Sequence, residues 1–258
     1  MIRIWPIEVL GDNYVWVLQP EEHPVVAVVD PGDAGPVIRA LDDRGLDLAA
    51  MLITHHHADH TSGVGALLAR GQVPVYGPAR ERIPTVSRPV TGGERVQINE
   101  LGVELMVLDV PGHTAGHIAF VGAGFVFCGD TLFAGGCGRL FEGTPLQMVD
   151  SLSRLAALPS GTEVYCAHEY TVSNLGFGHE VEPENTDLEA RLDDARRLRA
   201  HDRPTVPSTI ALELRTNVYL RCSTPDVVAA AERYAGRGLA DQVEVFAAVR
   251  GWKDGWRG

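Results

Sequence analysis

The chain has 258 residues, of which 45% are hydrophobic and 22% charged, as in an ordinary globular protein with a sizeable core. Its 22 Lys and Arg residues and 34 Asp and Glu residues give a formal net charge of −12. An acidic chain repels phosphate, so we do not expect nucleic acid as a partner, and an anionic substrate requires its own cationic clamp. No apolar run reaches the roughly 20 residues that span a bilayer, and the start MIRIWPIEVLGDNY lacks a secretion signal. We therefore expect a cytoplasmic protein with no membrane partner.

The first two-thirds of the chain is typical of strands separated by turns. Apolar, β-branched runs predict strands over 13–18 and 25–29, and helical spacing predicts a helix over 34–44, after a turn at Asp30-Pro31-Gly32. The run AAMLIT predicts a buried strand that ends at Thr54, and SGVGALLAR predicts a helix start. Further strands fit residues 73–76, 96–98, 103–110, 117–121, 124–128 and 163–167. Strands interleaved with a few helices favour an α/β or α+β layered domain.

Beyond about residue 170 the pattern becomes helical. Apolar residues recur at helical spacing among charges: Leu188, Leu192, Ala195 and Leu198. Thr224-Pro225 predicts a helix start, because a capping residue precedes a proline, and a last helix fits 240–250. We therefore predict two domains, residues 1–170 and residues 171–258.

The strongest chemical signal follows Thr54, in the segment His55-His56-His57-Ala58-Asp59-His60. Four histidines and an aspartate so close together are poor core material, whereas imidazole and carboxylate are the usual ligands of borderline divalent metals. In an extended chain His55 and His57 point to one side and His56 to the other. Asp59 and His60 come after a bend and can face a second point, so the spacing predicts two adjacent metal ions, with His56 not a ligand.

Three further ligand candidates stand where strands are predicted to end: His113, Asp130 and His168. A lone histidine is more often structural, and a lone aspartate more often caps a turn. A metal ion held by the first motif must, however, complete its coordination from elsewhere in the chain, so we add these three to the ligand set. We interpret His117 as structural, or as a partner that orients another ligand.

The four cysteines, Cys128, Cys137, Cys166 and Cys222, form no C-x-x-C pair, and a chain of this size needs no disulfide. We expect reduced cysteines in the core or in loops.

The motif T-H-x-H-x-D-H, followed in order by His113, Asp130 and His168, resembles the metallo-β-lactamase superfamily. The resemblance implies an α+β fold, a four-layered αββα sandwich with two metal ions on one rim. Within the superfamily the chain resembles the hydroxyacylglutathione hydrolases, or glyoxalase II, from end to end. The segments that carry this likeness include THHHADHTSG, PGHTAGHI, GDTLFAGGCGRLFEGT, AHEYTVSNLGF, VEPEN, TNVYLR and VRGWKD. The family's second domain corresponds to the small C-terminal helical domain predicted here.

The resemblance also implies roles for individual residues. One metal ion would be held by His55, His57 and His113, and the other by Asp59, His60 and His168, with Asp130 bridging both. In the helical, glutathione-binding domain, Arg250 and Lys253 would hold the glycine carboxylate of glutathione, and their spacing puts them on one helix face. Tyr170 and Asn174 stand where the family contacts the tripeptide. Arg139 and Phe141 stand where many members have Lys and Tyr, which changes one donor's geometry and removes a hydroxyl.

The implied reaction is hydrolysis of S-2-hydroxyacylglutathione thioesters, with S-D-lactoylglutathione giving D-lactate and glutathione, the second step of methylglyoxal detoxification. A hydroxide bridging two divalent ions would attack the carbonyl, oriented by Asp59 and Asp130. We expect zinc, with iron and manganese as alternatives. The leaving thiolate needs no general acid, because thiols are more acidic than alcohols or amines. We expect a monomer whose partner is the small thioester.

Other functions fit the same motifs less well. A persulfide dioxygenase shares the first domain but uses one iron, so retaining Asp59, His60 and His168 favours two metal ions. A superfamily nuclease or phosphodiesterase conflicts with the acidic chain, and a lactonase leaves Arg250 and Lys253 unexplained. A non-catalytic module with structural metal would favour closed, cysteine-rich sites over His and Asp ligands.

Overall fold

The computed structural model describes residues 2–21 and 23–257. The chain divides into two compact units. The first comprises Met1–Asp109 with Thr114–Gly129, and the second comprises Val110–His113 with Asp130–Gly258. The predicted division into residues 1–170 and 171–258 stays a prediction, and its outermost residues, 1 and 258, lie outside the described part of the chain.

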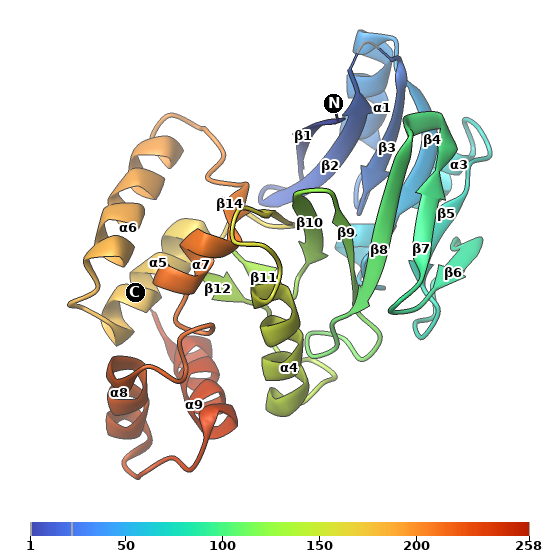
Figure 1. Cartoon of the computed structure of the whole chain (residues 1–258). Coiled ribbons are helices and arrows are strands. Elements are labelled where there is room, and N and C mark those ends of the chain that lie inside the picture. The colour runs from blue at the N-terminus through green and yellow to red at the C-terminus, as the bar shows by residue number, and fades with distance from the viewer. Residues whose placement is uncertain (1, 22, 258) are drawn as a thin grey trace. The chain divides into compact units, whose positions relative to one another are not determined.

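A mixed sheet forms the core of the first unit. Its strands, in spatial order, are β1 (Ile2–Val9), β2 (Asn13–Pro20), β3 (Val25–Val29), β4 (Asp47–Leu52), β5 (Val75–Pro78) and β6 (Arg88–Val90). The strands from β1 to β3 pair antiparallel, and those from β3 to β6 pair parallel. Helices α1 (Ala34–Arg44) and α3 (Val64–Leu68) pack on this sheet through Val37, Leu41 and Leu67 (Figure 1). The parallel arrangement brings the ends of β3 and β4, and the loops that follow them, to one edge of the sheet.

The first unit also contains four antiparallel strands joined as neighbours along the chain. They are β7 (Arg95–Ile98), β8 (Val103–Asp109), β9 (Ile118–Gly122) and β10 (Phe125–Gly129), with the short 3-10 helix Asn99–Leu101 between β7 and β8. Phe120 and Phe127 are paired residues of β9 and β10 and are fully buried. The chain leaves β8 and β10 at the two points where the predicted ligands His113 and Asp130 follow.

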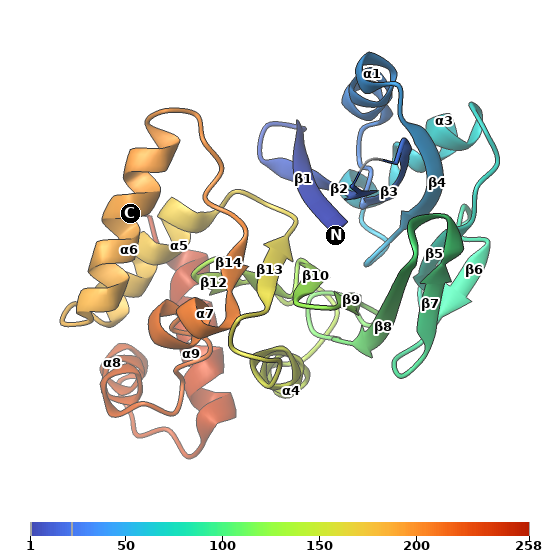
Figure 2. The same ribbon diagram turned by 45° about the horizontal axis from the view of Figure 1, so that its top comes forward.

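The second unit is mainly helical. Its short strands are β11 (Leu132–Phe133), β12 (Gly136–Cys137), β13 (Glu163–Cys166) and β14 (Ser208–Thr209). Its helices are α4 (Pro145–Ala156), α5 (Thr171–Val181), α6 (Thr186–Arg199), α7 (Ile210–Thr216), α8 (Pro225–Ala235) and α9 (Gln242–Gly255). Figures 1 and 2 both show α5 beside α6 and α8 beside α9, and these pairs are in contact. The helical character predicted beyond about residue 170 is confirmed.

The strand predicted over 25–29 and the helix predicted over 34–44 are confirmed to the residue. The last helix is longer than predicted, because α9 continues to Gly255. Helix α4 was not predicted, although Thr144 and Gln147 form a capping box around a proline at its start. Thr224 does precede α8, but its hydroxyl donates to the carbonyl oxygen of Arg221 instead of capping the helix. Among the described residues, no helix combines the length and the apolar character needed to cross a membrane.

A buried polar network fixes the β11–β12 hairpin to the helices of the second unit. The Glu213 carboxylate, fully buried on α7, accepts hydrogen bonds from the Gly135 amide at 2.9 Å and from Asn217 Nδ2 at 2.9 Å. Arg191 of α6 donates to the same carboxylate. Asn217 Nδ2 also lies 2.9 Å from the carbonyl oxygen of Gly136, so the hairpin backbone is held through one acid.

Replacing Glu213 by Ala should lower the free energy of unfolding by about 3–5 kcal/mol, because it leaves the buried Arg191 cation without its carboxylate. Urea denaturation at fixed metal concentration measures this change. Glu180, which is exposed on α5, supplies the matched control, since Glu180→Ala should change the stability by less than about 0.5 kcal/mol. Equal, small effects of the two substitutions would contradict the structural role of Glu213.

Candidate functional site

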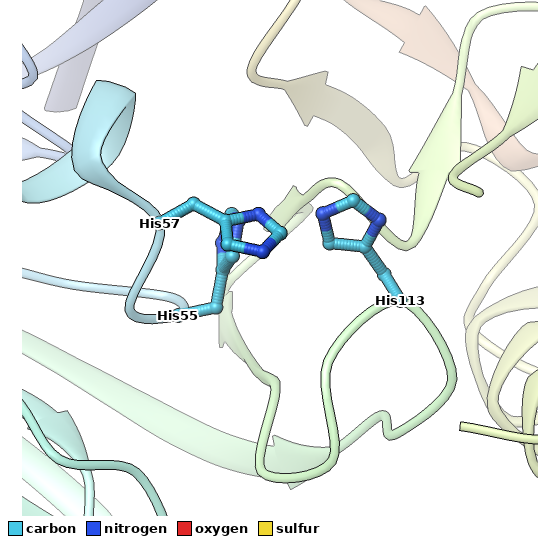
Figure 3. Close-up of side chains that lie close together, drawn as sticks. All are labelled: His55, His57 and His113. Carbon is cyan, nitrogen blue, oxygen red and sulfur yellow. The ribbon is translucent and has the colours of Figure 1, made fainter. Parts of the chain in front are cut away.

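The histidine-rich segment of the first unit follows β4 directly. His55 and His57 lie on the loop after this strand (Figure 3), and the four-residue helix α2 (Ala58–Thr61) holds Asp59 and His60. His55 Nε2 lies 3.0 Å from His57 Nδ1, and His60 Nε2 lies 3.3 Å from Asp59 Oδ2. The rings of His55 and His60 are centred 4.1 Å apart. The structure therefore brings together the four ligand candidates of this motif.

Asp30 holds this segment in place and was not recognised as a site residue from the sequence. It is buried at the end of β3, where its Oδ1 accepts a hydrogen bond from the Thr54 amide at 2.8 Å. Its Oδ2 accepts from Thr54 Oγ1 at 2.7 Å and from His60 Nδ1 at 3.1 Å. Because Nδ1 of His60 is occupied in this way, Nε2 is the nitrogen that can bind a metal ion. The sequence did contain a signal for Asp30: an aspartate that directly follows a buried strand. The same pattern identified Asp130 as a candidate.

Asp59 is held closely by its neighbours. A Cβ atom at Gly32 would lie 1.7 Å from the carbonyl oxygen of Asp59, so this position accepts only glycine. The adjoining His60 imidazole, and then the hydrogen bond from Asn13, hold the pKa of the Asp59 carboxyl well below its usual range. The carboxylate is therefore ionised at neutral pH, which is the form that binds a metal ion.

The two histidines interpreted as non-ligands have other partners. His56 Nδ1 lies 2.9 Å from Glu81 Oε2. His117 stacks on the ring of His55 with centroids 4.6 Å apart, and its Nδ1 lies 3.0 Å from the carbonyl oxygen of Ile118. Glu81 was not identified from the sequence. It also accepts a hydrogen bond from the Gly116 amide at 3.1 Å, so it joins His56 to the PGHTAGHI segment.

The second unit brings the other three ligand candidates together. His113 lies on the loop after β8 (Figure 3), Asp130 follows β10 and His168 follows β13. Asp130 lies between the two imidazoles, with Oδ2 3.5 Å from His113 Nε2 and Oδ1 3.3 Å from His168 Nε2. His113 Nδ1 donates to the carbonyl oxygen of Arg139 at 2.8 Å, which turns Nε2 toward Asp130. Each oxygen of the Asp130 carboxylate therefore lies near one imidazole.

The donors on these two units fit divalent metal ions of the borderline class. In the first unit, ligand atoms of Asp30, His55 and His60 lie within 4.8 Å of one another, and all donors are imidazole or carboxylate. Cysteine contributes little to this chemistry. No disulfide joins the four cysteines within the described chain, and burial raises the pKa of Cys137 to about 11 and that of Cys166 to about 12. Both thiols are therefore protonated at neutral pH and are poor nucleophiles.

A pocket of about 410 Å³ in the second unit contains every residue predicted to contact substrate. Its lining comprises His113, Asp130, Phe133, Cys137, Arg139, Phe141, Tyr170, Ser173, Asn174, Arg250 and Lys253. Two predicted metal ligands and three cationic side chains thus share one cavity. Tyr170 stacks on His168 with ring centroids 4.8 Å apart, and Phe141, 62% exposed, meets His113 edge-on at 5.2 Å.

The cationic side chains of this pocket are held in different ways. Arg250 is buried and donates to the carbonyl oxygen of Cys137 at 3.1 Å and to Asp254 Oδ1 at 3.0 Å. Lys253 donates to the carbonyl oxygen of Ser173 at 2.8 Å and lies 4.2 Å from the centre of the Trp256 ring. Burial, and then the positive charges of Arg250 and Arg139, lower the pKa of Lys253 to about 8. Mutual repulsion of this kind marks a pocket ready to receive an anion.

The side-chain amide of Asn174 makes a hydrogen bond within the protein. Its Nδ2 donates to the carbonyl oxygen of Ala134 at 3.2 Å, and the residue is buried on α5. It therefore lines the pocket while also holding the β11–β12 hairpin. Ser173 and Asp254, which position Lys253 and Arg250, were not identified from the sequence, because nothing in their local pattern marks them.

Two family models match the chain. The metallo-beta-lactamase superfamily model matches residues 10–168, and the model of the hydroxyacylglutathione hydrolase C-terminus matches residues 169–256. Among solved structures, ETHE1 from Myxococcus xanthus is similar with a TM-score of 0.67 and 26% identity, covering 96% of this chain and 89% of that one. TTHA1623, solved in a di-iron-bound form, is similar with a TM-score of 0.57 and 28% identity, covering 83% of this chain and 98% of that one. The predicted α+β fold of the metallo-β-lactamase type is confirmed.

Curated relatives match over nearly their whole length. A hydroxyacylglutathione hydrolase from Alkalilimnicola ehrlichii is 56% identical, covering 98% of this chain and 99% of the relative. One from Nitrosomonas europaea is 48% identical, covering 100% of this chain and 98% of the relative. The predicted family and enzyme class are confirmed. With both parts of the chain matched in order, the protein belongs to the hydroxyacylglutathione hydrolase family of the metallo-β-lactamase superfamily.

Proposed function

We propose that this chain hydrolyses S-2-hydroxyacylglutathione thioesters, with S-D-lactoylglutathione as the main substrate and D-lactate and glutathione as products. The observation that supports this most directly is the single pocket that joins His113 and Asp130 to Arg139, Arg250 and Lys253. If the thioester carbonyl binds near His113 and Asp130, the glutathione part of the substrate lies beside the three cationic side chains. The pocket thus combines an anion-binding region with a candidate hydrolytic centre.

We propose a binuclear site assembled from two ligand sets. His55, His57 and His113 would hold one ion, Asp59, His60 and His168 would hold the other, and Asp130 would serve both. The support is the order of the motifs, the family membership, and the convergence of donors seen separately in each unit. When bound, such ions supply a water of lowered pKa as nucleophile and a Lewis acid for the carbonyl.

The chain's own residues have three tasks in this reaction. Arg250 and Lys253 bind the glycine carboxylate through charge-assisted hydrogen bonds, with Arg139 adding positive charge at the pocket mouth. Tyr170 and Asn174 line the path of the tripeptide. Asp59 and Asp130 orient the attacking water. No protein acid is required for the departing sulfur, because a thiol ionises near pH 8–9.

Zinc is the proposed metal, and the cytoplasm the proposed location, because glutathione thioesters form among reduced intracellular thiols. A monomer is proposed because each chain supplies the full ligand set and the clamp. Metal content separates this proposal from the persulfide dioxygenase alternative, which requires one iron per chain instead of two ions.

The first test follows the loss of the S-D-lactoylglutathione thioester with purified, metal-loaded protein. We expect saturable turnover that a chelator abolishes. Asp130→Ala should lose bound metal together with more than about 100-fold in kcat/KM, since removing a bridging ligand costs more than removing an outer partner. Asp150→Ala, on the exposed side of α4, is the matched control and should leave both quantities unchanged. Full metal content and activity in Asp130→Ala would overturn the assignment.

The cationic pair Arg250 and Lys253 predicts a pH dependence of KM. Lys253 is protonated below its pKa of about 8 and loses its charge above it. KM for S-D-lactoylglutathione should therefore rise by about tenfold or more between pH 7 and pH 9.5, because an ionic hydrogen bond of about 1.5–3 kcal/mol is lost. Lys253→Arg stays cationic throughout this range and should remove most of the rise. An identical rise in both proteins would assign the titration to a group other than Lys253.

The exposed ring of Phe141 predicts a gain of binding on adding a hydroxyl. Phe141→Tyr at the pocket rim should lower KM about 2–10-fold, the value of one net hydrogen bond of roughly 0.5–1.5 kcal/mol, with kcat unchanged. Steady-state kinetics of the two proteins measure this effect. An unchanged KM would show that glutathione does not pass this side of the pocket.

A further inference from the structure

Asn13 follows a strained hairpin turn between β1 and β2. It is the first residue of β2 and pairs with Val9 of β1. The turn between them contains two residues with positive φ, Leu10 at 54° and Gly11 at 96°. A bulky residue such as leucine rarely adopts this conformation, and such strain persists where the surrounding structure requires it. The turn places the Asn13 side chain in a buried position, with 6% of the residue exposed.

The side-chain amide of Asn13 donates hydrogen bonds to Asp59, one residue of the histidine-rich segment. Its Nδ2 lies 3.0 Å from Asp59 Oδ2 and 3.4 Å from the carbonyl oxygen of the same residue. The same Oδ2 lies 3.3 Å from His60 Nε2, the nitrogen that Asp30 leaves available for a metal ion. A carboxylate oxygen accepts on two sides, so Oδ2 can accept from Asn13 and still face the point that His60 faces.

Packing alone does not fix the Asp59 carboxylate. Its side chain is 41% exposed and is carried by a helix of only four residues. The main chain of Asp59 lies against Gly32 and cannot shift, so the direction of the carboxylate depends on the contacts of its side chain. The hydrogen bond from Asn13 Nδ2 to Oδ2 is one of the contacts that select the orientation of this carboxylate.

We propose that Asn13 is a positioning residue that orients Asp59 for the second metal ion. The proposal rests on the ligand role proposed above for Asp59. Outer partners that hydrogen-bond to a ligating carboxylate fix its rotamer, and their loss typically weakens metal binding or activity by about 10–100-fold. A merely structural tie between the hairpin and α2 would instead affect folding and leave metal affinity intact.

The test measures metal binding by competition with a chromophoric zinc chelator, alongside steady-state kinetics. Asn13→Ala should weaken one of the two bound zinc ions about 10–100-fold and leave the other unchanged. kcat should fall with the occupancy of the weakened ion, while KM stays within about twofold, because no clamp residue is altered. Gln19→Ala is the matched control, since Gln19 is an amide of the same strand that accepts from Trp5 Nε1 at 3.2 Å.

Asn13→Leu, which keeps the branched shape without the donor, is measured in parallel in case the alanine variant does not fold. Wild-type affinity for both zinc ions in either folded variant overturns the proposal. Failure of both to fold in excess zinc also overturns it, because the amide is then structural. Asp59→Ala separates the two levels: if it binds both ions normally, the proposed ligand set fails whatever Asn13 does.

Discussion

The histidine-rich segment of the first unit depends on one buried carboxylate, that of Asp30. A buried charge is costly unless hydrogen bonds replace the lost water, and Asp30 receives three from Thr54 and His60. These bonds join the end of β3 to the end of β4 and to α2. Asp30 itself adopts a positive φ of 52°, a conformation that an aspartate tolerates better than most residues. The loop histidines are therefore placed by an acid that need not bind the metal itself.

The second unit also depends on a buried carboxylate, that of Glu213. Glu213 is fully buried and holds the short β11–β12 hairpin, whose two strands pair with each other. That hairpin carries Phe133 and Cys137 into the pocket and precedes Arg139. Close backbone contact completes the arrangement, since a Cβ atom at Gly138 would lie 2.0 Å from the Asp130 carbonyl oxygen. Buried carboxylates whose hydrogen bonds are all made, together with glycines that allow close backbone contact, thus fix loops and short strands in place. The side chains on these segments then hold defined positions.

The sequence was sufficient to predict many of the strands and helices and to select the ligand candidates, because both depend on local patterns. Strand periodicity gave 25–29, helical spacing gave 34–44, and the His and Asp residues stood at predicted strand ends. The supporting residues depend on contacts between distant segments: Asn13 meets Asp59 across 46 positions, and Glu213 meets Gly135 across 78. Nothing local marks such residues. Burial of Arg250 was equally unpredictable, because a basic residue near a helix end is usually solvated.

Arg139 contributes to the pocket through both its main chain and its side chain. Its main-chain carbonyl accepts from His113 Nδ1, a contact that any side chain at this position would leave intact. Its guanidinium Nε lies 3.4 Å from Asp254 Oδ1, which also accepts from Arg250. One carboxylate therefore offsets part of the charge of two arginines, and Lys253 beside them still has a lowered pKa. The pocket lining carries three cationic side chains and one carboxylate within a chain of net charge −12, so we expect it to attract an anionic substrate locally despite the overall repulsion.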